Sequence, residues 1–406
     1  MLRFVNVNNI VGVIMPKTRK RPVLASKTFI KLGLTFYGKR YFKKQVTLKT
    51  IGSLKNIKPP YIVVANHSGF ADVGGLVVDA YPNLINFVIS VTQIVKWPKG
   101  IKYMGILPKK QFAVDTTLIR DIKYVLEQKR IVAIYPEAKL SVVGTPNIIK
   151  PNIAKLIKLL KAPLVTVRFD GSYLHKPRWA KNKRFVPMTA EVKLAVTGEE
   201  IADISVDEIY RRITTNLNYD DYAYQLENKI EIDVPNLTEG LEGILYKCPE
   251  CNEEFAMTAK GNTLICGKCG KVVTQNKYGQ LEGGRFDKVT DWYAWQTECV
   301  RNEVECPDYS LSARFSAEKL VGKNYVNVGE GKIVHNTDGI TATFGNEKLF
   351  YKAGAFYTLS FNNDYLYLPT SEAVYRFKRL EKLGCTTKFN LAVEQQSELL
   401  EKAHKN

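Results

Sequence analysis

Three features are scarce in this 406-residue sequence, and each scarcity narrows the classes of protein to which it can belong. No stretch of about 18 consecutive apolar residues is present, so no membrane-spanning helix is expected. The apolar opening Met1–Pro16 is interrupted by asparagines and lacks a small-residue cleavage site, so it does not resemble a signal peptide. Cysteine occurs seven times, four of them in two close pairs. That usage is typical of metal ligands in a reducing compartment, not of a disulfide framework.

Acidic residues are absent from the first 71 positions, and the charge of the chain is divided unevenly. Residues 1–198 contain 35 Lys and Arg against 8 Asp and Glu, a net charge of +27. Residues 199–406 contain the other 24 and 32, a net charge of −8, which gives the total of +19. A basic half of this kind indicates a surface that meets a polyanion. Anionic lipid and nucleic acid both fit, and charge alone does not choose between them.

The segment 26–44 combines aromatic and apolar side chains with six lysines and arginines. This pattern predicts an amphipathic helix in a lipid interface, with rings at the acyl boundary and cations at the phosphates. The alternative is a helix that packs on a core and exposes a basic face to water.

From residue 61 onward, short apolar runs alternate with helical patterns. Strands are predicted over residues 61–65, 85–90, 131–135, 163–169 and 191–196. Asp115 is expected to cap one helix, Pro151 to open another, and residues 206–230 to hold one or two more. Strands that alternate with helices predict an α/β layer domain. After residue 286 the segments become β-like, with turn signals between them and a helix near residues 390–403.

The chain is therefore divided into four predicted parts. They are an N-terminal membrane-interface segment (1–60), an α/β layer domain (61–235), a cysteine module (240–285) and a β-rich domain ending in a helix (286–406).

One motif indicates catalysis. In VVANHSGFADVGG, residues 63–75, an apolar strand runs into His67, and Asp72 follows five residues later. A histidine at a strand exit lies at the sheet edge, where α/β proteins place their sites. A carboxylate that folds back onto the imidazole would fix its tautomer and make it a general base for an alcohol. A histidine that makes only a local loop hydrogen bond is the alternative.

The segment resembles the first block of the glycerolipid acyltransferase family, which includes the lysophosphatidic acid acyltransferases: Asn-His-x4-Asp after an apolar strand. Three further segments resemble later blocks of that family in the same order. They are YMGILPKK (103–110), IVAIYPEAKLS (131–141) and APLVTVRF (162–169). The resemblance covers about residues 25–230.

The resemblance implies that His67 is the base and Asp72 its partner. It implies an acceptor site made by residues of the first three blocks: Asn66, Lys109, Lys110, Glu137, Lys139 and Ser141. The acceptor hydroxyl would attack the thioester of acyl-carrier protein or acyl-CoA, or in some systems an acyl phosphate, without a covalent acyl-enzyme.

The third block departs from the family pattern. It usually reads Pro-Glu-Gly-Thr-Arg-Ser, whereas Pro136 to Ser141 reads Pro-Glu-Ala-Lys-Leu-Ser. Lys139 would supply a point charge in place of the bidentate fork of arginine. A lysophospholipid other than lysophosphatidic acid, or a lipid-linked sugar, therefore remains open as the acceptor. The basic run His175 to Trp179 is either a further source of cations or a solvated loop.

The cysteine pairs form a second motif. Cys248 and Cys251 are followed after fourteen residues by Cys266 and Cys269. Four thiolates at this spacing predict a closed, structural tetrahedral zinc site, a zinc ribbon. A ribbon that has lost its metal is the alternative. The region lacks a strong basic footprint, so nucleic acid is not expected as its partner.

The sequence thus predicts a cytoplasmic acyltransferase, peripherally bound to the inner face of the membrane. Its expected partners are an anionic membrane surface, acyl-carrier protein or acyl-CoA as donor, and a lysophospholipid acceptor, first of all 1-acyl-glycerol-3-phosphate. A non-enzymatic lipid-binding or nucleic-acid-binding protein built on the basic domain and the ribbon is the alternative.

Overall fold

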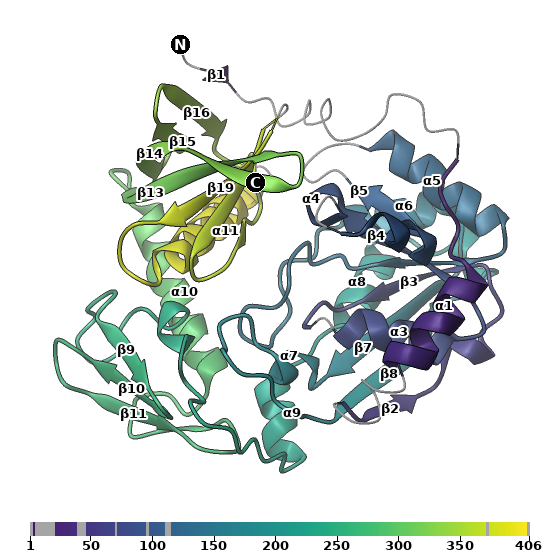
Figure 1. Ribbon diagram of the computed structural model, residues 1–406, viewed down its shortest axis with the longest axis horizontal. Helices are drawn as coiled ribbons and strands as arrows, with labels where there is room; N and C mark the ends of the chain where they lie inside the picture. Colours follow the sequence, from purple (N-terminus) through teal and green to yellow (C-terminus); the bar gives the residue numbers. More distant parts are fainter. Residues whose placement is uncertain are drawn as a thin grey trace.

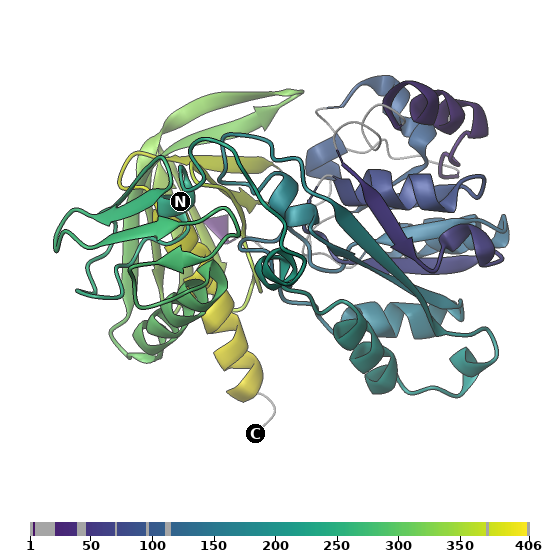
Figure 2. The same ribbon diagram turned by 90° about the horizontal axis from the view of Figure 1, so that it is seen from below.

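Three β-sheets organise the protein. The computed structural model describes residues 3–4, 21–38, 46–69, 71–94, 97–109, 115–370 and 373–403. Within them one sheet has seven strands, one has eight and one has four. Figure 1 shows the seven-stranded sheet and its helices as the right half of the molecule and the other two sheets as the left half; Figure 2 shows the same division from below. The predicted mixed α/β class is confirmed, while the four predicted domain boundaries stay a prediction.

The seven-stranded sheet follows the order β2-β8-β7-β3-β6-β4-β5. Its neighbours run parallel except for β8, which is antiparallel to β7. The strands are β2 (Leu48–Ile51), β3 (Tyr61–Ala65), β4 (Ile85–Ser90), β5 (Ile106–Lys109), β6 (Ile131–Ile134), β7 (Leu164–Asp170) and β8 (Met188–Val196). Because β3, β6 and β7 are parallel neighbours, their carboxyl ends meet at one edge of the sheet.

Both faces of this sheet are covered, which explains why its central strands are apolar throughout. Along β3, Ile62 and Val64 enter one core and Tyr61 and Val63 enter the other, as the two-residue period of a strand requires. The helices of this half are α1 (Lys27–Gly33), α3 (Ala71–Ala80), α4 (Val91–Ile94), α5 (Thr116–Glu127), α6 (Asn152–Leu160), α7 (Ser172–His175), α8 (Val206–Asn216) and α9 (Asp221–Glu227). Side chains of α5, α6 and α8 fill the first core, and side chains of α3 fill the second.

Local signals set the helix starts. The Asp115 carboxylate accepts a hydrogen bond from the Leu118 amide at 3.0 Å, which confirms the predicted cap of α5. Pro151 precedes α6, as expected. At α1 the Ser26 hydroxyl accepts from the Phe29 amide, and a π-helical turn (Leu34–Gly38) continues the helix. The rest of the predicted 26–44 helix, residues 39–44, lies outside the described residues.

The other half contains the small sheet and the eight-stranded sheet. The small sheet consists of β9 (Met257–Lys260), β10 (Thr263–Cys266), β11 (Val272–Gln275) and β12 (Leu281–Glu282). The large sheet consists of β13 (Ser310–Val321), β14 (Asn324–Asn336), β15 (Gly339–Phe344), β16 (Glu347–Lys352), β17 (Ser360–Phe361), β18 (Tyr365–Pro369) and β19 (Val374–Arg379). The N-terminal strand β1 (Arg3–Phe4) adds to its edge beside β16.

Two helices pack together in this half, and the sequence indicated only one of them. Helix α10 (Val289–Glu305) was not predicted, and α11 (Cys385–Ala403) begins earlier than residue 390. Nearly every residue from Cys385 to Ser397 is buried, so α11 has no amphipathic period to mark its start. Tyr173 of the first half, Leu264 of the small sheet and Phe389 of α11 share one apolar core. No helix among the described residues is long and apolar enough to span a membrane.

Candidate active site

Asn66 and His67 directly follow β3, at the carboxyl edge of the seven-stranded sheet. The buried amide of Asn66 donates to the Phe169 carbonyl at 2.8 Å and accepts from the Phe169 amide at 2.7 Å. An amide side chain can do both at once, so Asn66 continues the hydrogen bonding between β3 and β7 beyond Ala65, the last paired residue of β3. Asn66 therefore fixes the exit of β3, which aims His67 away from the sheet. Its expected role in binding the acceptor stays a prediction.

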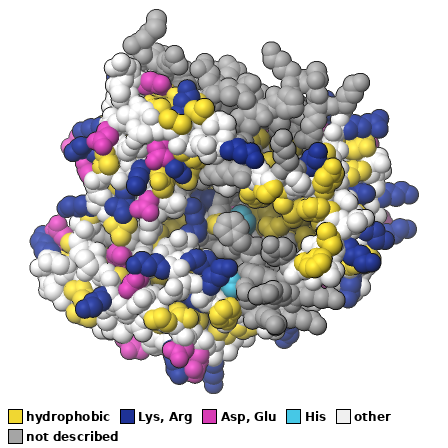
Figure 3. Space-filling model, viewed as in Figure 1, with side chains coloured by type: hydrophobic (Ala, Val, Ile, Leu, Met, Phe, Trp, Pro, Cys, Tyr) yellow, Lys and Arg dark blue, Asp and Glu magenta, His cyan; other side chains and the backbone are white. Residues whose placement is uncertain are grey.

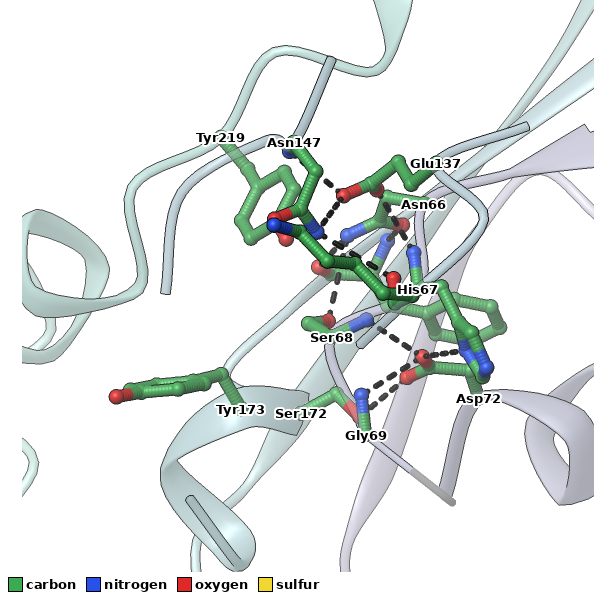
Figure 4. A network of polar contacts seen from close by, with 12 residues as sticks. Asn66, His67, Ser68, Gly69, Asp72, Glu137, Asn147, Ser172, Tyr173 and Tyr219 are labelled. Atoms are coloured by element: carbon green, nitrogen blue, oxygen red, sulfur yellow. Dashed lines mark hydrogen bonds and ion pairs between the residues drawn. The ribbon is translucent and has the colours of Figure 1, made fainter. Parts of the chain in front are cut away.

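The structure brings His67 and Asp72 together (Figure 4). His67 Nδ1 lies 3.4 Å from Asp72 Oδ2, and the imidazole is partly exposed while the carboxylate is fully buried. Asp72 Oδ2 also accepts the amides of Ser68 and Gly69, each at 2.9 Å. These donors fix the position of the carboxylate beside the imidazole, in the first turn of α3. With Nδ1–H donated to Asp72, Nε2 is the basic nitrogen of the ring.

Ser172 completes the environment of Asp72. Its hydroxyl donates to Oδ1, the oxygen that does not face His67. Ser172 is the first residue of α7, which follows β7, so the carboxyl ends of β3 and β7 both contribute to the pair. Gly69 leaves room for this contact, because a Cβ there would lie 2.7 Å from the Ser172 carbonyl oxygen.

Glu137 holds the backbone of the histidine loop. It is fully buried; Oε1 accepts the His67 amide at 2.9 Å, and Oε2 accepts the backbone and side-chain N–H groups of Asn147 at 2.8 Å. Burial raises the pKa of Glu137, and these donors oppose that rise. Ser141 donates its amide to the His67 carbonyl at 2.8 Å. The third block therefore holds both backbone polar groups of His67, its N–H through Glu137 and its carbonyl oxygen through Ser141.

Ala138 occupies the strained position of that block. Its φ of 60° lies in the left-handed region, where glycine is favoured and another residue costs about 1 kcal/mol. The family that the block resembles has glycine there. The departure therefore changes the residue and keeps a turn that glycine favours.

Tyr135 stacks on His67 and was missed by the sequence analysis. The two ring centroids are 4.4 Å apart with an interplanar angle of 29°. Tyr135 directly follows β6, beside β3 in the sheet, so its position at the site follows from the sheet order. Asn147 and Ser172 were missed as well, and no local pattern marks either of them.

The three lysines that were predicted to bind the acceptor lie in different surroundings. Lys139 turns away toward α11, where its ammonium pairs with Glu394 at 2.5 Å and donates to Asn390 at 3.1 Å. Lys109 lies half-buried at the end of β5, and burial lowers its pKa. Lys110 lies outside the described residues. The Lys139 charge is thus already neutralised by the protein.

The four cysteines of the ribbon converge. All four sulphurs lie within 4.8 Å of one another, with Cys248 to Cys269 at 3.8 Å and Cys251 to Cys266 at 3.7 Å. Four ligands of a tetrahedral zinc ion at about 2.3 Å would lie about 3.8 Å apart. The donor set fits a metal ion of that size and leaves no open coordination position.

No protein-family model matches the sequence, and no curated protein matches it. Among solved structures, the crystal structure of the 1-acyl-sn-glycerophosphate (LPA) acyltransferase from Thermotoga maritima is similar at 18% identity and a TM-score of 0.39. The match covers 51% of this chain and 83% of that chain. A similarity of this size carries no functional argument, so the function proposed below depends on the site itself.

Proposed function

We propose that the protein is an acyltransferase that moves an acyl chain from a thioester to the hydroxyl of a lysophospholipid. One observation carries the proposal: a partly exposed imidazole whose second nitrogen faces a buried, fully hydrogen-bonded carboxylate at the carboxyl edge of an α/β sheet. That arrangement makes a general base for an alcohol.

The reaction needs no covalent enzyme intermediate. His67 Nε2 takes the proton of the acceptor hydroxyl as its oxygen attacks the thioester carbonyl. The tetrahedral intermediate then expels the thiolate, which takes the proton back from the imidazolium. Asp72 stabilises the imidazolium between the two steps. The products are an ester and a free thiol, and His67 is regenerated.

A membrane surface is the proposed workplace, at the inner face of the cytoplasmic membrane. Leu32 and Phe36 at the N-terminal helix are 56% and 68% exposed, beside Lys27 and Lys31. Exposed apolar groups next to cations are typical of a segment that lies in an anionic interface. In the view of Figure 1, Figure 3 shows hydrophobic side chains gathered on the right half of the molecule, the half that contains the seven-stranded sheet.

The acceptor is proposed to be 1-acyl-glycerol-3-phosphate, with acyl-carrier protein or acyl-CoA as donor. A specific observation favours a second candidate, a different lysolipid acceptor: Lys139, the cation of the third block, is paired with Glu394. The ribbon is proposed to hold zinc in a structural role.

The test is acyl transfer by the purified protein on anionic vesicles. Lysophosphatidic acid is offered beside lysophospholipids with other head groups, each with acyl-CoA and with acyl-carrier protein. The expected product is the diacyl lipid, formed together with free thiol. Thiol release that does not depend on any acceptor would indicate a thioesterase, and no product with folded, vesicle-bound protein would contradict the proposal.

A further inference from the structure

The segment 175–184 has an unusual charge. It contains five cations and no acidic residue, in the order His-Lys-Pro-Arg-Trp-Ala-Lys-Asn-Lys-Arg. It begins at the end of α7, the helix whose first residue bonds Asp72. Figure 1 shows α7 near the boundary between the two halves of the molecule. The segment therefore connects the candidate active site to the C-terminal half.

Most of these cations are held by neutral groups. Lys176 donates to the carbonyl oxygens of Ala180 and Lys181, and Arg184 donates to that of Leu237. Within the described part of the chain only Lys181 of this segment has an ion pair, with Glu239. Backbone carbonyls thus hold Lys176 and Arg184 and leave their charges uncancelled. The segment is thus a source of positive potential.

Arg178 is the cation of this segment that contacts the C-terminal half. Its guanidinium donates to the carbonyl oxygen of Phe361, at the end of β17, and lies 5.9 Å from the centre of that ring. Arg178 is half-buried, and no carboxylate among the described residues pairs with it. The surrounding protein lowers the pKa of Arg178 to about 10, because it removes water from the cation.

The second cation at the same ring shows the contrast. Lys139 Nζ lies 5.5 Å from the centre of Phe361 and is neutralised by Glu394. In the described part of the chain Arg178 has no such partner, although removing water from a cation without pairing it with an anion is unfavourable. A desolvated guanidinium without an anionic partner is a candidate anion-binding group, and its planar fork suits two phosphate oxygens at once.

We propose that Arg178 binds a phosphate ester of a substrate, in a site formed jointly by the segment 175–184 and the C-terminal sheet. The assignment to a substrate rests on the proposed acyltransferase function. Two substrates carry this chemistry: the acceptor in its head group, and the donor in the phosphopantetheine arm of its thioester. In either case the C-terminal sheet is part of the binding site.

The first experiment measures phosphate binding without turnover. Inorganic phosphate is added to the full-length, metal-loaded protein, with sodium chloride at equal ionic strength as the reference, and Tm is recorded. Phosphate is expected to raise the Tm of the wild type and of Arg314→Gln, which removes an exposed arginine of β13. Arg178→Gln is expected to lose the increase. An equal increase in Arg178→Gln would overturn the site.

The second experiment identifies which substrate uses the site. Arg178→Gln is expected to raise one KM about 10- to 100-fold with a much smaller change in kcat, the loss of a charge-assisted contact. A change in the acceptor KM that is absent with monoacylglycerol, which lacks the phosphate, assigns the site to the acceptor. A change in the donor KM assigns it to the donor. If neither KM changes, the assignment to a substrate is wrong.

Two controls separate misfolding from binding. Arg178→Lys keeps the charge and loses the fork, so an intermediate KM is expected, and its Tm without phosphate shows whether the interface survives. If the wild type transfers no acyl group to any acceptor, the proposed function fails, and the phosphate-dependent Tm alone decides whether the site exists.

Discussion

The cysteine cluster and the histidine site differ in how far apart in the sequence their residues lie. The four cysteines lie within Cys248–Cys269, and two short turns bring their sulphurs together. The histidine site joins residues from the ends of β3, β6 and β7, and its hydrogen bonds connect positions up to 103 apart. A local cluster can be recognised from spacing and chiefly stabilises its surroundings. A site assembled by the sheet depends on the whole layer and can be changed chemically while the fold is kept.

Metal removal is expected to have the largest effect of any change on stability. Structural zinc in zinc-finger peptides contributes about 10–16 kcal/mol of apparent binding free energy at pH 7. Cys248 and Cys266 belong to the same core as Val142 and Tyr173, so loss of the ribbon should spread to the neighbouring half. A chelator should lower Tm in step with metal loss. Cys306 is an exposed cysteine outside the cluster, so Cys306→Ser should change neither metal content nor Tm. A metal-free protein with unchanged Tm would contradict the structural role of the cluster.

Asp72→Asn should do the reverse and reduce activity without loss of fold. The amide oxygen can replace Oδ2 and keep the bonds from Ser68 and Gly69, while the amide nitrogen can donate to Ser172. Only the charge beside His67 is lost, so acyl transfer should fall roughly 10²- to 10⁴-fold. Steady-state kinetics and Tm are measured on the same preparation. A variant as active as the wild type would show that the carboxylate does not assist the base.

The ion pair between Lys139 and Glu394 joins the two halves of the molecule, so breaking it should lower the free energy of unfolding. Lys139→Met leaves the carboxylate buried and unpaired, which typically costs about 3–5 kcal/mol. Replacing both partners, Lys139→Met with Glu394→Leu, should recover part of that loss. Lys150→Met breaks a more exposed ion pair to the same helix, with Glu401, and should cost about 0–1 kcal/mol. Denaturant unfolding would measure these changes in the free energy of unfolding, and a double variant no more stable than the single one would contradict the pairing.

A buried histidine outside the candidate active site tests the comparison by pH. His335 is fully buried between Tyr309 and Gln396, and burial lowers its pKa to about 4. The unfolded chain takes up this proton near pH 6.5, so the stability is complete above pH 6.5 and is lost as the pH falls toward 4. The loss should reach about 3 kcal/mol at pH 4. His335→Gln should show a shallower decline, and identical declines would exclude His335 as the cause.

Much of the layer could be predicted, because its strands are short apolar runs with both faces buried. The predicted strands at 61–65 and 85–90 coincide with β3 and β4, and the Asp115 cap follows from local chemistry. Helix α10 was missed because its aromatic and acidic residues follow no clean helical period. The cysteine cluster was predictable because the four residues that form the motif are themselves the metal ligands.

The histidine pair was predictable for the same local reason, whereas its surroundings were not. Ser172 reaches Asp72 only through the order of the strands, and Tyr135 reaches His67 in the same way. Lys139 was expected at the acceptor, but its partner lies 255 residues further on in a helix that no local pattern connects to it. The role of a charge depends on its partner, and a sequence does not show partners across such a separation.

The most direct test of the account compares two histidine substitutions in one acyl-transfer assay. His67→Ala removes the base, and His335→Gln removes a buried ring of β14. We expect His67→Ala to lose at least about 10²-fold in kcat with Tm unchanged, and His335→Gln to lose stability with normal activity per folded molecule. A His67→Ala protein that transfers acyl groups at the wild-type rate would contradict the central claim.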